Sequence, residues 1–191
     1  MSKTLTGGGT VRKLWPTEIE KFRDHLLRLD KASRRLRFGL TVDDTFIAAY
    51  AARANFKTTV IYGYFIGGEM HAAAELRCVG EAWGAEAEAA FSVEPAFQDG
   101  GVGTDLLGRV LLAARNRGID RLYMNCLSEN RKMQRIARKY DAELHFDHGE
   151  VVGKVRTPGP TPATLWSEAI DDGSGFVMGV LDLPLRLLAA A

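Results

Sequence analysis

The sequence predicts an α/β fold, in which a mixed, mostly antiparallel and twisted sheet is flanked by helices and followed by a C-terminal extension. Segments with helical periodicity alternate with runs of β-branched and aromatic residues. Gly67 and Gly68 separate two of these runs and supply a two-residue turn, which makes the runs a hairpin. The order helix, strands, helix, strand, helix then indicates an α/β domain with a mixed sheet.

The N-terminal third is expected to hold one strand and two helices. Residues 11–15 read as a short strand. Thr17 and Glu20 form a capping box, and apolar residues fall on one stripe of the helix expected at 18–29. A second helix is expected at 43–54, because it opens with acidic residues that suit the positive end of a helix dipole.

Further elements are expected, in chain order, at 58–66, 69–78, 84–93, 101–117, 119–127 and 130–140. Pro95 cannot donate to a ladder, so the strand before it ends there. The apolar face of residues 101–117 makes this the strongest helix in the chain.

Length and charge limit the classes of function. The chain of 191 residues fits one domain with a short appendage. Lys and Arg number 25 against 24 Asp and Glu, so the net charge of +1 does not favour nucleic acid as a partner. Arg34, Arg35 and Arg37 are interpreted as a solvated helix or loop face.

Cysteine usage and hydropathy indicate a cytoplasmic protein. Cys78 and Cys126 cannot build a disulfide framework, and no signal segment opens the chain. No apolar run approaches the roughly 20 residues that cross a bilayer, so no membrane association is expected.

The domain boundary is expected between residues 157 and 158, giving a domain at 1–157 and an extension at 158–191. Pro158, Pro160 and Pro162 form a linker signature, and a helix is expected at 164–171. The later apolar residues need a surface to cover them, either the core or a second subunit in a homodimer.

The segment richest in chemical information is Gln98-Asp-Gly-Gly-Val-Gly-Thr104. Backbone N–H groups at a helix N-terminus suit phosphate oxygens, and glycine permits close approach, although Gly-Gly turns before helices are also common without a ligand. A P-loop would need Lys where Thr104 stands, and a dinucleotide motif would need glycine at Leu106. ATP, GTP and NAD are therefore not expected.

The turn resembles the acetyl-CoA pyrophosphate motif of the GNAT superfamily of N-acetyltransferases, which reads Gln or Arg, two residues, Gly, one residue, Gly or Ala. Gln98, Gly101 and Gly103 occupy its fixed positions. Residues 87–93 are similar to the fourth strand of that superfamily. Asn130-Arg-Lys-Met133, with Lys139, is similar to the motif of its following helix.

Within the superfamily, the chain most resembles bacterial protein-lysine acetyltransferases of the Pat type, whose domains act on acyl-CoA synthetases. This resemblance rests on Ser33-Arg-Arg-Leu-Arg-Phe38, Ala87-Glu88, Phe97-Gln98 and Leu127-Ser-Glu-Asn130. It implies a GNAT-like fold and an enzyme that acetylates protein lysine.

The resemblance also implies that acetyl-CoA is the co-substrate and which residues bind it. These are Phe91, Ser92, Val93, Gln98, Asp99, Gly100, Gly101, Val102, Gly103, Thr104, Asn130 and Met133. Pantetheine would lie along a splayed strand, with the Val93 N–H near the thioester carbonyl, where it can stabilise the oxyanion. Asn130 would bond the pantetheine arm, or it would cap its helix, and both roles fit the sequence.

A carboxylate is the expected general base, because an amine must lose a proton before it attacks. Glu86 and Glu88 alternate onto one strand face, where a pair of solvated acids is the alternative interpretation. Glu88 matches the glutamate that Pat-type enzymes use as base, so the resemblance implies that Glu88 is catalytic.

The general acid is not evident. Many GNAT enzymes place a tyrosine seven residues after the asparagine, where this chain has Ala137, and Tyr140 would face another direction. Either the thiolate leaves without a side-chain acid, or a group such as Ser128 or Cys126 serves.

The reaction is expected to need no metal. His145 and His148, with Asp147 and Glu150, do not give three convergent ligands, and a polar hairpin loop is the preferred interpretation.

The sequence thus predicts an acyltransferase that moves the acetyl group of acetyl-CoA directly to an amine, with a protein lysine as the expected acceptor. A small amine is the alternative acceptor. A CoA-binding sensor that has lost catalysis is the alternative from another class, and Ala137 keeps it open.

Overall fold

In the computed structural model, the backbone of residues 8–189 and the side chains of residues 8–175 are described. Seven strands form one sheet in the order β1-β2-β3-β4-β5-β7-β6. Their bounds are β1 Thr10–Lys13, β2 Thr59–Ile66, β3 Glu69–Cys78, β4 Glu86–Val93, β5 Arg121–Leu127, β6 Glu143–Asp147 and β7 Glu150–Arg156. β4 and β5 are parallel and the other neighbouring pairs are antiparallel, which confirms the predicted mixed, mostly antiparallel sheet.

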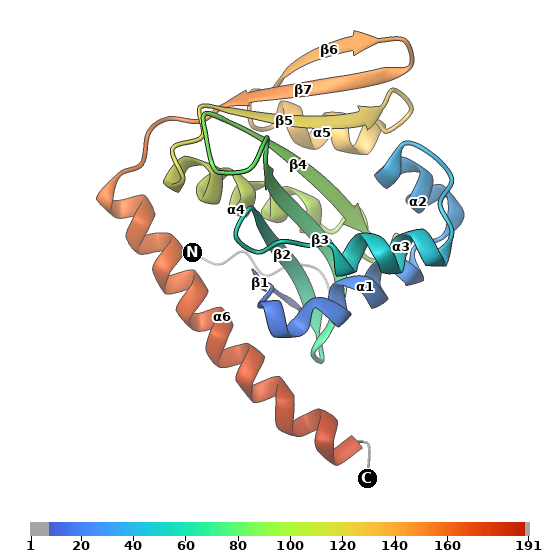
Figure 1. Cartoon of the computed structure of the whole chain (residues 1–191), viewed down its shortest axis with the longest axis vertical. Coiled ribbons are helices and arrows are strands. Elements are labelled where there is room, and N and C mark those ends of the chain that lie inside the picture. Colours follow the sequence, from blue (N-terminus) through green and yellow to red (C-terminus); the bar gives the residue numbers. More distant parts are fainter. Residues whose placement is uncertain (1–7, 190–191) are drawn as a thin grey trace.

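Helices cover both faces of the sheet (Figure 1). One face carries α1 Ile19–Arg28, α2 Lys31–Phe38 and α3 Asp44–Ala52, and the other carries α4 Val102–Asn116 and α5 Arg131–Arg138. β2 is therefore buried along almost its whole length, as a strand between two helical layers should be. Each face has its own hydrophobic core, around Phe22 and Ile47 on one side and Leu106 and Val110 on the other.

The hairpin between β2 and β3 turns at Gly67 and Gly68 as predicted. Their φ angles are +55° and +77°, both in the left-handed region that a two-residue primed turn requires. Glycine adopts this region without steric cost, which explains why the pair is read so clearly from the sequence.

The parallel pairing of β4 and β5 covers only part of β4. The paired positions run from Glu86 beside Arg121 to Glu88 beside Tyr123. β4 continues to Val93. Residues 89–93 of β4 still pair with β3 but have no partner on β5. The two strands therefore splay apart and leave a gap in the middle of the sheet.

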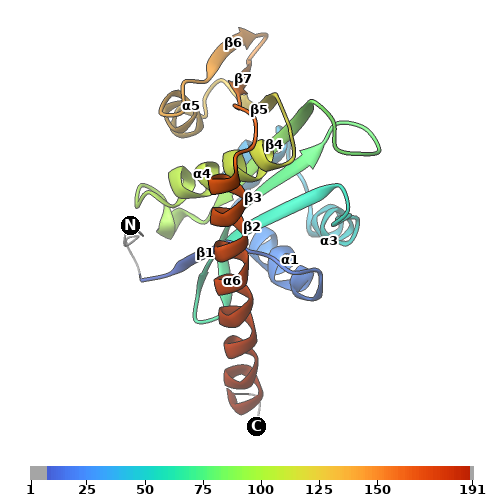
Figure 2. The same ribbon diagram turned by 90° about the vertical axis from the view of Figure 1, so that its left-hand side faces the viewer.

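The extension forms one long helix, α6 Pro162–Ala189, at the edge of the sheet beside β1 and α4 (Figure 2). Lys13 Nζ lies 2.8 Å from Asp172 Oδ2, and Asn116 Nδ2 donates to Glu168 Oε2 at 2.7 Å. Gly175 permits a close approach, since a Cβ there would lie 3.1 Å from the Arg12 Cβ. The helix expected at 164–171 is thus part of a longer one. It begins at Pro162, because proline is tolerated in the first turn of a helix, and it continues to Ala189.

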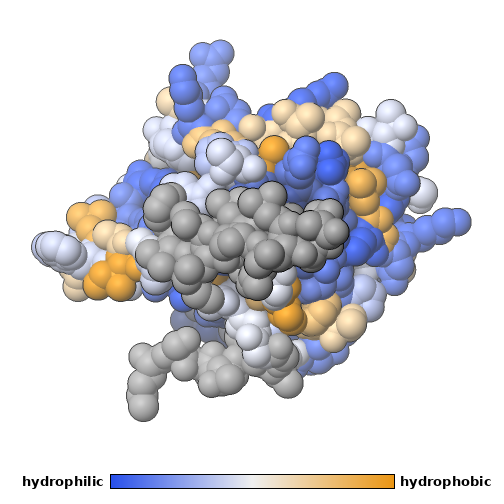
Figure 3. All heavy atoms as spheres, turned by 90° about the horizontal axis from the view of Figure 1, so that it is seen from below, coloured by the Kyte–Doolittle hydropathy of each residue, from blue (hydrophilic) through white to orange (hydrophobic). Residues whose placement is uncertain are grey.

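The far half of α6 runs beyond the sheet (Figure 1). The apolar residues that need covering, from Phe176 to Leu188, lie outside the residues with described side chains. Hydrophobic residues occur in separate patches among hydrophilic ones on the face seen from below (Figure 3). Within residues 8–189, no helix combines the length and apolarity required to cross a membrane.

Three of these helices and strands were not predicted: α2, β6 and β7. The polar hairpin loop expected around His145 and His148 is confirmed, since it joins β6 and β7. The arginines of α2 were interpreted as a solvated face, and this is wrong for Arg37, whose side chain is only 7% exposed and forms an ion pair with Glu75. Arg34 donates to the carbonyls of Leu29 and Leu27, at 3.0 and 2.6 Å. These partners lie on other segments, so the arginine run alone does not show them.

Candidate active site

The glycine turn leads directly into α4. Asp99 and Gly101 have φ angles of +62° and +88°, and Gly101 is the N-cap of the helix. The Gly101 carbonyl accepts from the amides of Thr104 and Asp105, each at 3.0 Å. The amides of Val102 and Gly103 precede these first helical hydrogen bonds, so this end of α4 has the geometry of an anion-binding helix N-terminus.

Side chains hold the turn between β4 and α5. Gln98 Nε2 donates to the Val93 carbonyl at 2.9 Å. Lys132 Nζ donates to Gln98 Oε1 at 2.9 Å and to Asp99 Oδ2 at 2.7 Å. Lys132 was not predicted as a site residue, although it lies inside the Asn-Arg-Lys-Met motif.

A groove runs from this turn along the splayed end of β4. It is lined by all but two of the residues predicted to bind acetyl-CoA, namely Phe91, Ser92, Val93, Gln98, Asp99, Gly101, Gly103, Thr104, Asn130 and Met133. The other two, Gly100 and Val102, do not line it. The Val102 side chain is buried in the core, so only its backbone amide faces the N-terminal end of α4.

The groove is also basic. Arg37 from α2 borders it, and Lys132, Arg135 and Lys139 come from α5 or its C-terminal end. Their positive charges complement phosphate groups placed at the N-terminus of α4. Lys139 belongs to the quoted helix motif, whereas Arg135 carried no signal in the sequence.

The free edge of β4 supplies backbone groups to the groove. The Glu94 N–H donates to the His71 carbonyl of the β3 side at 3.1 Å. Because backbone groups point alternately to the two sides of a strand, those of Phe91 and Val93 point toward the gap where β5 has diverged. An extended ligand in this gap can therefore form hydrogen bonds with the backbone of β4, as β5 does between Glu86 and Glu88.

Asn130 caps α5. Its Oδ1 accepts from the Met133 amide at 3.1 Å, so the capping interpretation is confirmed. Capping occupies the acceptor end of the side-chain amide and leaves the Nδ2 donor end for another partner.

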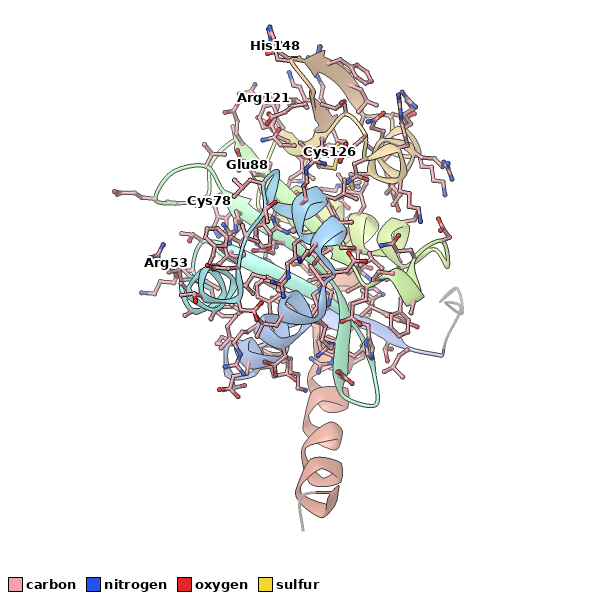
Figure 4. All side chains as sticks on the ribbon, turned by 90° about the vertical axis from the view of Figure 1, so that its right-hand side faces the viewer. Arg53, Cys78, Glu88, Arg121, Cys126 and His148 are labelled. Carbon is pink, nitrogen blue, oxygen red and sulfur yellow. The ribbon has the colours of Figure 1, made fainter. Side chains whose placement is uncertain are left out.

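A second hollow lies on the α2 side of the same gap. It is lined by Leu36, Arg37, Phe38, Gly39, Tyr50, Arg77, Glu88, Ala89, Ala90, Asn125, Cys126, Leu127 and Glu150. Leu36 and Arg37 border both this hollow and the groove. Figure 4 shows Glu88 beside α2. The two cavities thus meet at the splayed strand.

The two neighbouring glutamates of β4 have different surroundings. Glu86 accepts from Arg121 Nε at 2.7 Å and from the Tyr123 hydroxyl at 3.0 Å, and these hydrogen bonds lower its pKa. Glu88 is exposed, and its side chain has no hydrogen bond or ion pair with the described part of the chain. Of the two, Glu88 is the carboxylate available to accept a proton from a ligand.

Other groups considered for proton transfer are less suitable. Ala137 is buried and has no proton to give. The Tyr140 hydroxyl donates to the Thr104 carbonyl at 2.9 Å, and burial raises its pKa. Burial also raises the pKa of the Cys126 thiol, which disfavours a reactive thiolate.

Among the described residues, no group of three metal-ligating side chains converges.

A buried network fixes α2 over the site. Arg37 contacts Glu75 and lies 2.5 Å from the Tyr50 hydroxyl, and Arg77 Nη2 lies 2.9 Å from Glu75 Oε2. Burial raises the pKa of Tyr50 to about 12, so its hydroxyl stays protonated. This network positions Leu36 and Arg37 between the two cavities.

Comparison with known proteins agrees with this geometry. A model described as the acetyltransferase (GNAT) family matches residues 11–141. The GNAT domain of S. lividans PAT is 25% identical, with a TM-score of 0.69 over 82% of this chain and 96% of that one. The ribosomal-protein-S18-alanine N-acetyltransferase from Escherichia coli shares the fold at 14% identity, with a TM-score of 0.58 over 81% and 97% of the two chains.

A longer protein also matches. The cAMP-binding acyltransferase from Mycobacterium smegmatis is 20% identical, with a TM-score of 0.59, and the match covers 94% of this chain. This chain spans 55% of that protein, so the likeness concerns one part of it.

Proposed function

Because the chain belongs to the acetyltransferase (GNAT) family, and is thus an acyltransferase that uses acetyl-CoA for N-acetylation, we propose that its acceptor is the side chain of a protein lysine. The observation that carries this proposal is the chemistry of the hollow beside Glu88. Leu36, Phe38 and Leu127 offer apolar contact, and Glu88 and Glu150 offer negative charge. A lysine combines a methylene stem with a cationic head, and so matches both. The two arginines that also line the hollow, Arg37 and Arg77, are paired with Glu75.

Exposure supports a protein acceptor over a small amine. Glu88 is exposed rather than enclosed, so a side chain that projects from another protein can reach it from the surface. The resemblance to Pat-type domains includes Glu88 and the segment from Ser33 to Phe38, whose last three residues line the same hollow, and it points to the same acceptor.

The groove residues have distinct roles in this proposal. The amides of Val102 and Gly103, with Lys139 and Arg135, hold the pyrophosphate and phosphate groups. Phe91 and Val93 bind the pantetheine arm through their backbone groups, and the Val93 N–H stabilises the oxyanion that forms during attack. Asn130 donates to the same arm through Nδ2.

Glu88 removes one proton from the lysine ammonium, directly or through a water molecule, and so makes the nitrogen nucleophilic. The nitrogen then attacks the thioester carbon in the gap between β4 and β5. Acetyl transfer is direct. A covalent acetyl-cysteine would need the Cys126 thiolate, and burial disfavours this thiolate because it raises the pKa of the thiol.

The experiment is incubation of the protein with acetyl-CoA and a panel of acceptors while CoA release is followed. The panel contains an acyl-CoA synthetase, unrelated folded proteins and small amines, and mass spectrometry locates any acetyl group. Acetyl-lysine on a protein, formed faster than any acetylated small amine, is the expected result. Preference for a small amine would overturn the acceptor. Acetyl-CoA binding without CoA release for any acceptor would favour the sensor function instead.

We also propose that residues 158–191 form an extension through which two copies associate. Leu165, Trp166 and Ile170 of α6 are 49%, 69% and 66% exposed, which is unusual for apolar side chains of this size. Deletion after Pro158 should change the sedimentation behaviour of the protein or cause aggregation. A truncated protein that stays soluble, with the same oligomeric state as the full chain, would contradict this.

A further inference from the structure

A hydrogen-bonded chain of side chains lies behind the groove. His25 of α1 is fully buried, with Nε2 2.8 Å from Ser92 Oγ and Nδ1 3.0 Å from Glu94 Oε1. The second oxygen of Glu94 lies 3.0 Å from Nδ1 of His71 on β3. Arg28 Nε also donates to Glu94 Oε1, at 3.1 Å. Glu94 is thus the centre of a cluster formed by α1, β3 and the end of β4.

The chemistry of the Glu94 carboxylate fixes the direction of its hydrogen bonds with the two histidines. A carboxylate only accepts, so His25 and His71 each donate the N–H of Nδ1 to Glu94. Burial opposes the ionised form of Glu94, but hydrogen bonds from His25 and His71 outweigh it and lower the pKa of Glu94 to about 2. Burial lowers the pKa of His25, so its ring is neutral at rest and Nε2 accepts a hydrogen bond from the Ser92 hydroxyl.

Ser92 connects this cluster to the site. It borders the groove, precedes Val93 on the splayed strand and is 7% exposed. The cluster therefore forms a Ser–His–Glu series. Its outer member faces the place proposed for the thioester, and its central histidine is fully shielded from water. Packing alone does not need a buried imidazole at His25, because an apolar side chain fills such a site without the cost of burying polar atoms.

The reaction has a proton that Glu88 does not account for. A lysine ammonium carries three protons, and the amide product keeps one. Glu88 takes one proton and returns it to solvent. The remaining proton must leave the nitrogen, and the departing CoA sulfur must gain one. Ala137 supplies no hydroxyl for this second transfer.

We propose that Ser92 and His25 shuttle this second proton from the attacking nitrogen to the leaving sulfur. As the C–N bond forms, Ser92 Oγ takes a proton from the nitrogen while its own hydroxyl proton passes to His25 Nε2. As the C–S bond breaks, Ser92 gives a proton to the sulfur and regains one from His25. Both residues end in their starting state, and no proton is gained or lost by the pair.

The charged neighbours of His25 suit this role. Glu94 is a positioning residue, which holds the ring through Nδ1 and stabilises the transient imidazolium. The other charged or titratable groups around the cluster are Arg28 and His71, with Glu69 2.9 Å from Arg28 Nη1. Arg28 opposes the imidazolium, while Glu94 lies closer to it, in direct contact with Nδ1.

The proposal rests on N-acetyl transfer but not on the identity of the acceptor, so its test uses whichever amine the wild-type protein accepts. Ser92→Ala and His25→Gln should each lower kcat with acetyl-CoA by about 30- to 100-fold. Calorimetry should show acetyl-CoA affinity within threefold of wild type for both. A wild-type protein inactive with every amine would refute the proposed function, and with it this role.

A second acyl donor distinguishes proton delivery from structural support. The acetyl thioester of nitrothiophenol has a leaving thiolate that is stable without a proton. Ser92→Ala should therefore lose much less activity with this donor than with acetyl-CoA. Ser92→Thr keeps a hydroxyl and should recover most of the acetyl-CoA activity. His148→Asn, which removes an exposed imidazole on the turn between β6 and β7 and leaves this cluster intact, should stay within about threefold of wild type.

Two results would overturn the shuttle. One is Ser92→Ala activity within threefold of wild type with acetyl-CoA. The other is an equal loss with both donors, which would assign the cluster to anchoring α1 against β4.

Discussion

The site has two walls, which are built in different ways. The turn at 98–104 is made of consecutive residues and presents mainly backbone amides, held by Gln98 and Lys132. The other wall presents side chains. It comprises the second hollow with Glu88, the network of Arg37 and Glu75, and the cluster of His25 and Glu94 behind Ser92, so its members come from α1, α2, β3 and β4. Backbone amides suit a constant feature such as phosphate, whereas proton transfer needs side chains with suitable pKa values. Binding and chemistry are therefore expected to separate when the two walls are mutated.

The largest expected effect belongs to the side-chain wall. Glu88→Gln should lower turnover by roughly a hundredfold or more, because glutamine keeps the size of the side chain but cannot take a proton. Acetyl-CoA affinity should not change. Initial rates of CoA release as a function of pH would check this. The variant should lose any limb of the pH–rate profile that reflects the ionisation of Glu88.

Glu86→Gln is the matched control. Glu86 lies two positions earlier on the same strand face, but its carboxylate is held by Arg121 and Tyr123. Its turnover should stay within about threefold of wild type. A large loss for Glu86→Gln with none for Glu88→Gln would move the base to Glu86, and no loss in either would favour deprotonation by solvent.

A smaller effect is expected from the basic residues of the groove. Lys139→Ala and Arg135→Ala should each weaken acetyl-CoA binding by about tenfold, and less at high salt, because each removes a charge beside the phosphate groups. Arg138→Ala is a suitable control, since Arg138 lies on α5 but not in the groove. Calorimetry at two salt concentrations would show the difference. Equal losses for all three variants would indicate a general charge effect.

The smallest effect concerns stability in acid. The pKa of Glu94 falls from 4.5 to about 2 on folding, so its ionised form stabilises the protein above pH 4.5. This contribution is lost as the pH falls from 4.5 through 2. Glu94→Gln should lower the free energy of unfolding by about 1 kcal/mol at neutral pH, after allowance for solvent screening, and flatten its pH dependence in that window.

Glu18 offers a control for this stability effect. Its pKa is also lowered to about 2: burial opposes this, but hydrogen bonds to Arg12 and Lys21 outweigh it. Glu94→Gln should also lose turnover, because Glu94 positions His25. Glu18→Gln should show a similar change in chemical denaturation between pH 2 and 5 without losing turnover. Equal losses of turnover in both variants would mean that stability, rather than the position of Glu94, controls activity.

The same contrast explains what could be predicted from the sequence. The turn was identified because its information is local: the spacing of Gln98, Gly101 and Gly103 needs no other segment. The hairpin glycines were equally clear, since only glycine adopts two successive left-handed positions freely. Val102 was assigned to the site by its place in the motif, but the direction that the helix gives its side chain takes it into the core.

The side-chain wall could not be predicted in this way. His25 lies 67 positions from Ser92 and 69 from Glu94, and nothing local to any of the three indicates the others. Arg37 appeared solvated because its partner, Glu75, lies 38 positions away on β3. The strands β6 and β7 were missed because a polar turn at His148 and Gly149 dominates that segment, where φ angles of +40° and +91° form the hairpin.

The most direct test of this division between the walls is calorimetric titration of acetyl-CoA into four proteins: wild type, Gly103→Val, Gly108→Val and Glu88→Gln. Both glycines lie on α4, and a Cβ at either would lie 2.9 Å from the end of a neighbouring side chain, Ile136 for Gly103 and Tyr140 for Gly108. Only Gly103 also lines the groove. The account predicts affinity at least a hundredfold weaker for Gly103→Val and within a few-fold of wild type for the other two. Unchanged affinity in a folded Gly103→Val protein, or equal weakening by both glycine variants, would contradict it.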